Sequence, residues 1–90
     1  MIGSDPDAQR RIVHRLRRAR GQLDAVLTAV EAGKSCRDIV TQLSAVSAAL
    51  DRAGFAIVSA AMKECVTGED GDNAEGLTTE ELEKLFLMLA

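Results

Sequence analysis

Apolar residues recur every three or four positions over the first third of the chain, and this spacing predicts a long amphipathic helix over residues 6–32. Asp5 and Pro6 form a typical helix start, because Asp accepts hydrogen bonds from free backbone amides and Pro needs no amide partner. Gly33 is a typical stop. The apolar positions form a heptad seam of Ile12, Leu16, Ala19, Leu23, Val26 and Val30.

A second helix is predicted over residues 36–67, where the apolar spacing continues. Ser35 and Asp38 match the capping box that often opens a helix. Gly54 interrupts the pattern at a cost of about 1 kcal/mol relative to Ala, and we expect a close helix contact there. The second seam consists of Ile39, Leu43, Val46, Leu50, Ile57, Ala61 and Cys65.

A short third helix is predicted over residues 78–89, opened by a second capping box from Thr78 to Glu81. A polar linker, residues 69–76, precedes it. Its apolar stripe consists of Leu82, Leu85, Phe86 and Leu89. No segment alternates as a strand does, so we expect one all-α domain over residues 1–90.

Two long helices joined by a short connection predict an antiparallel hairpin. Two such rods and one short helix cannot enclose a core, so apolar seams should stay open in a single chain. A second chain is the simplest cover, and it predicts an antiparallel four-helix-bundle dimer with two-fold symmetry.

Charge is distributed unevenly, although the net charge is only −3. Residues 8–37 hold eight basic side chains against two acidic ones, whereas residues 64–90 hold eight acidic side chains against one basic one. A basic block at one end of a chain is a candidate surface for a polyanion.

Six arginines fall within residues 10–20 with no acid among them, and several recur at helical spacing opposite the apolar seam. This pattern attracts phosphates and favours double-stranded DNA as a partner. The simpler alternative is a solvated face, and we interpret His14 as a surface or phosphate-contact residue. The candidate DNA-binding residues are Arg10, Arg11, Arg15, Arg18 and Arg52.

The opening residues lack the basic start and apolar stretch of a signal peptide. No uninterrupted apolar run approaches the ~20 residues of a membrane span. We therefore expect a cytoplasmic protein with no membrane partner. In a reducing compartment, two cysteines more often indicate metal or redox chemistry than a disulfide framework.

Cys36 and Cys65 are 29 residues apart on one predicted helix, which separates them by roughly 43 Å. A disulfide needs Cα atoms within about 7 Å, so one intact helix cannot join its own thiols. An antiparallel partner helix, centred near Leu50, would bring Cys36 of one chain to Cys65 of the other. The helix-start position favours Cys36 as the attacking thiol and Cys65 as the resolving one. The alternative is two inert, buried cysteines.

The segments RLRRARGQLDAV, EAGKSCRDIVTQLSAVSAAL and KECV resemble the copper-sensing repressor family (CsoR/RcnR-type bacterial regulators). The resemblance extends from about Arg11 to Val66, with a weaker similarity from Leu77 to Leu89. It implies an all-helical dimer that pairs into a tetramer (a dimer of dimers) and has no enzymatic activity. It also implies that the protein binds operator DNA until an inducer engages thiols of two chains.

The resemblance also implies residue roles. Cys36 and Cys65 match the two sensing cysteines, Arg15 and Arg52 match basic residues needed for DNA binding, and Glu81 matches an acidic residue of allosteric coupling.

One departure bears on the inducer. Copper sensors of this family carry His four residues before the second cysteine, and this chain has Ala61 there. Ser35 also replaces the aromatic residue often found before the first cysteine. The chain is therefore more similar to the persulfide-sensing branch (CstR-like), which implies a persulfide or polysulfide inducer and no required cofactor.

Three alternatives remain. Cu(I) is soft and can bind Cys36 and Cys65 as two thiolates, which makes a copper-sensing repressor the first alternative. A sulfur-carrier or thiol-transfer protein needs only two thiols, but no general base is evident. A helical interaction module with inert cysteines is the simplest alternative.

Overall fold

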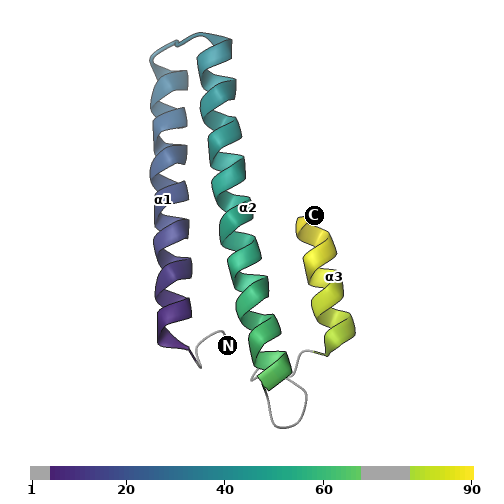
Figure 1. Cartoon of the computed structure of the whole chain (residues 1–90). Helices are drawn as coiled ribbons and strands as arrows, with labels where there is room; N and C mark the ends of the chain where they lie inside the picture. Colours follow the sequence, from purple (N-terminus) through teal and green to yellow (C-terminus); the bar gives the residue numbers. More distant parts are fainter. Residues whose placement is uncertain (1–4, 68–77) are drawn as a thin grey trace.

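The computed structural model describes the backbone of residues 5–67 and 78–90, with side chains over residues 5–63 and 78–90. Three helices form the described chain: α1 (Pro6–Glu31), α2 (Cys36–Thr67) and α3 (Thr79–Leu89), as Figure 1 shows. The described residues contain no strand, so the all-α prediction is confirmed. The predicted linker lies outside the described residues.

The start of α1 follows the predicted cap. The Asp5 carboxylate accepts hydrogen bonds from the backbone amides of Asp7 (3.0 Å) and Ala8 (3.3 Å). These bonds satisfy two of the free amides that every helix start leaves.

At the other end of α1, the chain turns at Gly33, whose φ of +69° is in the left-handed region that favours glycine. The backbone amide of Lys34 donates to the carbonyl of Ala29 (3.0 Å), and that of Gly33 donates to Val30 (3.1 Å). This pair of bonds is the Schellman motif, and it ends α1 one residue before the predicted boundary.

Both later helices begin at the predicted hydroxyl caps. The Ser35 side chain accepts from the backbone amide of Asp38 (3.2 Å), and the Thr78 side chain accepts from that of Glu81 (3.1 Å). The first cap fixes Cys36 as the first residue of α2.

Small apolar residues form the contact between α1 and α2, which run antiparallel as predicted (Figure 1). Alanines let two helices approach closely, and they dominate this contact. The buried residues are Ala8, Ile12, Ala19, Val26 and Ala29 on α1 and Val46, Ala49 and Ala53 on α2.

The predicted α1 seam is only half buried. Ile12, Ala19 and Val26 are covered by α2, whereas Leu16, Leu23 and Val30 are 41%, 45% and 55% exposed. The reason is geometric, since α2 covers one side of the apolar stripe and leaves the other side open. Open seams were the expectation for a single chain.

The short helix α3 packs against α2 and makes no contact with α1 within the described part of the chain. Leu82 is buried against Val58 and Ala61 of α2. The rings of Phe55 and Phe86 lie 5.6 Å apart between centroids, in a tilted arrangement. These contacts hold α3 along the carboxyl-terminal half of α2.

Gly54 lies under the carboxyl end of α3. A Cβ atom added there would stand 3.0 Å from two methyl carbons of Leu89. The close helix contact expected at this glycine is therefore confirmed, and its neighbour is α3.

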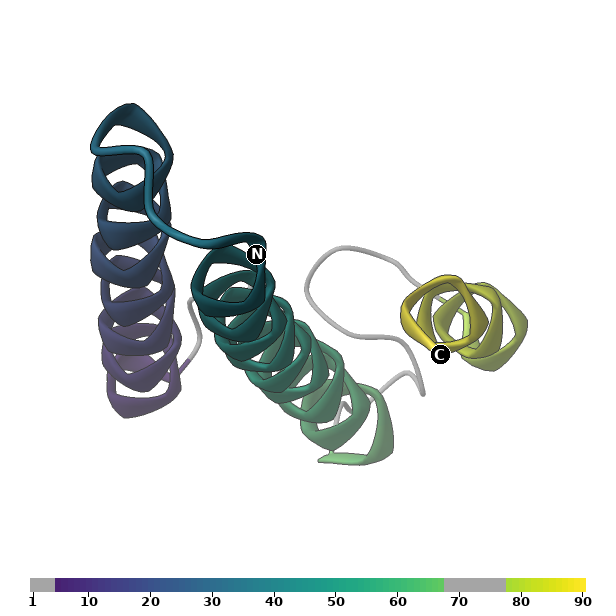
Figure 2. The same ribbon diagram turned by 90° about the horizontal axis from the view of Figure 1, so that it is seen from above.

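The three helices form a single layer with principal extents of 54 × 25 × 13 Å. Figure 2 shows α2 between α1 and α3. No large side chain among the described residues is fully buried, because a single layer has no interior.

The expectation about membrane spans needs correction. Residues 36–63 of α2 are long and apolar enough to cross a membrane by length and composition. Each apolar run within α2 is short, because polar residues such as Ser44 and Ser47 and the charged residues Asp51 and Arg52 interrupt it. A single helix of this kind is weak evidence for a membrane protein, because the core helices of soluble proteins have the same composition.

Candidate functional site

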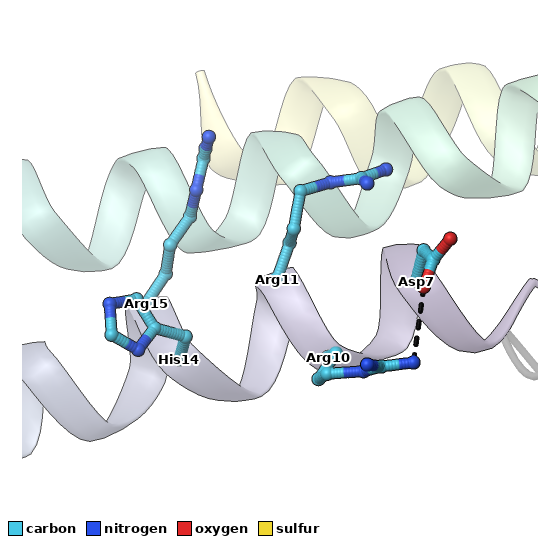
Figure 3. A pocket seen from close by; sticks show the side chains of 5 residues that line it. All are labelled: Asp7, Arg10, Arg11, His14 and Arg15. Carbon is cyan, nitrogen blue, oxygen red and sulfur yellow. Dashed lines mark hydrogen bonds and ion pairs between the residues drawn. The ribbon is translucent and has the colours of Figure 1, made fainter.

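Five side chains of the first half of α1 line an open depression of about 540 Å³ (Figure 3). Three are arginines, one is the only histidine, and one is an acid: Arg10, Arg11, Arg15, His14 and Asp7. Their spacing of three and four residues places them on one face of the helix. The depression thus gathers positive charge on one side of the molecule, where a phosphate-bearing partner would be attracted.

One acid lies within this basic group. The Asp7 carboxylate accepts a hydrogen bond from the Arg10 guanidinium at 3.1 Å, and both side chains are about three-quarters exposed (77% for Arg10 and 74% for Asp7). Asp7 is not among the site residues that the sequence predicts. The spacing of three residues between an acid and an arginine on one helix was the signal that would have found this pair.

Arg15 connects the basic face of α1 to α2. Its guanidinium donates to the backbone carbonyl of Arg52 at 3.4 Å. Two predicted DNA-binding residues from distant parts of the sequence therefore lie next to each other. Arg11 lines the same depression, whereas Arg18 is exposed farther along α1 and outside it.

Cys36 is a free, exposed thiol at the first position of α2. Lys34 and Arg37, both exposed, flank it in the chain. The backbone of Cys65 lies at the opposite end of the same helix, and its side chain is outside the described residues. An unbroken α2 confirms that one chain cannot bring its own two cysteines together.

Ala61, one helical turn before Cys65, is 8% exposed and packs with Val58 and Leu82. The position at which the resemblance places His in copper sensors is thus a packing contact beneath α3. Glu81 is exposed in the first turn of α3, directly before Leu82. Among the side chains that the structure describes, those of residues 5–63 and 78–90, no three His, Cys, Asp or Glu residues are grouped to hold a metal ion.

Residues 8–89 match a protein family described as metal-sensitive transcriptional repressor. The chain belongs to this family. Its members are transcriptional repressors and not enzymes, which argues against the thiol-transfer alternative.

Two curated relatives of this repressor are named as copper sensors. The copper-sensing transcriptional repressor RicR of Mycobacterium tuberculosis is 36% identical over 69 residues, covering 73% of this chain and 72% of RicR. The copper-sensing transcriptional repressor CsoR of Mycobacterium ulcerans is 36% identical over 59 residues, covering 66% of this chain and 50% of that protein.

A third relative, the uncharacterized protein YrkD of Bacillus subtilis, is 41% identical over 58 residues. The match covers 62% of this repressor and 92% of YrkD. No solved structure matches the repressor.

Proposed function

We propose that this repressor binds operator DNA through the arginines of α1 and Arg52, and that it releases the DNA when a persulfide or polysulfide joins Cys36 of one chain to Cys65 of another. The proposal of a persulfide inducer rests on buried Ala61. The position that would supply a nitrogen ligand is an alanine packed against Leu82, so the two cysteine sulfurs are the donors at the proposed sensor.

The proposal requires a second chain. The exposed apolar residues on α1 and α2 support an antiparallel dimer, and the family resemblance supports a tetramer. Leu43 and Leu50 are both 48% exposed on the seam that joins the two cysteines of α2. Such residues are stabilised when a partner covers them. We place the assembled protein in the cytoplasm, where its thiols stay reduced and its DNA partner lies.

The proposed reaction needs no cofactor. The Cys36 thiolate attacks the terminal sulfur of a small persulfide, RSSH, which gives a Cys36 persulfide and releases RSH. The Cys65 thiolate of the second chain then attacks the Cys36 sulfur, forms a disulfide and expels hydrogen sulfide. Overall, RSSH and two thiols yield RSH, H₂S and one inter-chain disulfide. The thiols are oxidised and the sulfane sulfur is reduced.

A Cu(I)-sensing repressor is the second candidate, and the named functions of RicR and CsoR favour it. Cys36 and Cys65 would hold Cu(I) as two thiolates, which suit this soft ion. The residues fit a two-sulfur site and do not fit one with an imidazole ligand, since Ala61 takes that place. Bound Cu(I) would supply a link between two chains without oxidising either thiol.

One experiment separates the two inducers. An operator duplex is first selected from random sequences, and its affinity is measured for reduced, persulfide-treated and Cu(I)-loaded protein. The mass of each intact protein sample is also measured by mass spectrometry without reductant. Persulfide sensing predicts lost DNA binding together with a two-chain species that has lost two hydrogens per bridge. The Cys36→Ser variant should bind DNA and ignore persulfide.

Unlinked modification with unchanged DNA binding would contradict the persulfide proposal. Copper sensing predicts instead that Cu(I), competing against a strong chelator, abolishes DNA binding at one equivalent per thiol pair.

A further inference from the structure

We propose that Asp7 is an internal competitor for DNA phosphate, holding Arg10 in the free protein and releasing it to a phosphodiester when the repressor binds. This inference rests on the proposed DNA binding and adds to it a residue that weakens the complex. A carboxylate on a surface built to attract anions has an electrostatic effect opposite to that of its neighbours, and Asp7 lies within the depression itself.

The contacts around the depression support this exchange. Asp7 pairs with Arg10 at 3.1 Å, and Arg15 donates to the Arg52 carbonyl. Figure 3 shows Arg11 extending along the same face without reaching Asp7. Among the described residues that line the depression, the three arginines are accompanied by one carboxylate, that of Asp7, so further negative charge is favoured at this face.

A guanidinium binds carboxylate and phosphate oxygens through the same planar set of donors, so the two anions compete for Arg10. The Asp7–Arg10 pair is well exposed, and exposed ion pairs are weak. A phosphodiester, fixed in place by the other arginines, can therefore displace the carboxylate. Asp7 also repels every phosphate that approaches the depression, so it lowers DNA affinity in two ways.

The test measures binding to a short duplex of fixed, arbitrary sequence, because phosphate contacts carry no sequence information. The variants are Asp7→Asn and a matched control, Asp24→Asn, which removes one exposed carboxylate from another face of α1. We expect Asp7→Asn to bind about two- to fivefold more tightly at low salt. The gain should shrink as salt rises, since screening weakens exposed charges.

A double-mutant cycle identifies Arg10 as the partner. In the Arg10→Gln background, the gain from Asp7→Asn should fall to the part that comes from phosphate repulsion alone, and circular dichroism should show equal helix content in every variant. Equal gains from Asp7→Asn and Asp24→Asn, or a gain that is undiminished without Arg10, would overturn the inference. Failure of the inducers to release DNA would refute the proposed sensing and leave this result intact.

Discussion

Ala61 connects the packing of α3 to the sensing that we propose for this repressor. The methyl side chain of Ala61 fits beneath Leu82. An imidazole ring there would need more room, so either the backbone of α2 or the position of α3 would have to shift. An alanine at this position therefore has two effects. It offers no nitrogen donor, and it allows α3 to pack tightly one turn before Cys65.

We expect Ala61→His to destabilise the fold by about 1–3 kcal/mol, because inserting a ring into a packed contact strains its neighbours. It should also tighten Cu(I) binding by adding a third donor near Cys65. Urea unfolding and chelator competition measure the two effects.

The matched control is Met62→His, which places the same ring at the next position, where the side chain is half exposed. It should leave stability nearly unchanged. Equal unfolding free energies for the two variants would contradict the packing role of Ala61.

At the scale of elements, α3 is held by one buried leucine, one aromatic pair and one contact over a glycine. The residues of α2 that make these three contacts lie between Gly54 and Ala61. α3 therefore runs along α2 from the turn before Cys65 to the neighbourhood of Arg52. Cys65 belongs to the proposed sensor, and Arg52 belongs to the proposed DNA-binding surface.

Leu82→Ala should undock α3. Removing a buried leucine costs about 2 kcal/mol or more, so the protection of α3 amides against hydrogen exchange should fall at least tenfold. Exchange in α1 should stay unchanged.

Leu87→Ala on the same helix is the control, because Leu87 is exposed and its loss should not affect protection of α3. If Leu82→Ala leaves α3 as protected as Leu87→Ala does, this leucine does not anchor the helix.

The helices and their caps could be predicted because they depend on local signals. Asp5, Gly33, Ser35 and Thr78 act on amides or dihedral angles within a few residues of themselves. Periodicity identified the apolar seams but not which half would be covered, since that depends on the neighbour. Leu16 and Ile12 belong to one stripe, yet only Ile12 is buried.

The candidate site was predictable in part. Clustered arginines stand out in a sequence, whereas the contact from Arg15 to the Arg52 carbonyl depends on how two helices are aligned. Asp7 was missed because one acid beside many bases looks like ordinary surface charge. The partner proposed for Cys65 belongs to a second chain, so their contact depends on the assembly.

At the scale of the whole molecule, a single layer of helices is too thin to bury its own large apolar side chains. A stable interface typically buries about 800 Å² on each partner. The open leucines of α1 and α2 are the apolar surface that such an interface would cover.

Leu50→Glu tests the assembly at the proposed two-fold centre. Leu50 is half exposed in one chain, so the charge should cost little there, whereas in an antiparallel α2 contact it would bury two carboxylates side by side. Sedimentation should show a shift from dimer or larger to monomer, and persulfide should no longer produce a covalent two-chain species. Ala45→Glu is the control, because this exposed position lies two turns before Arg52 on the basic side of α2 and should leave the assembly intact. An unchanged sedimentation coefficient for Leu50→Glu would rule out the antiparallel α2 contact, and with it the meeting of Cys36 and Cys65 on which the proposed sensing depends.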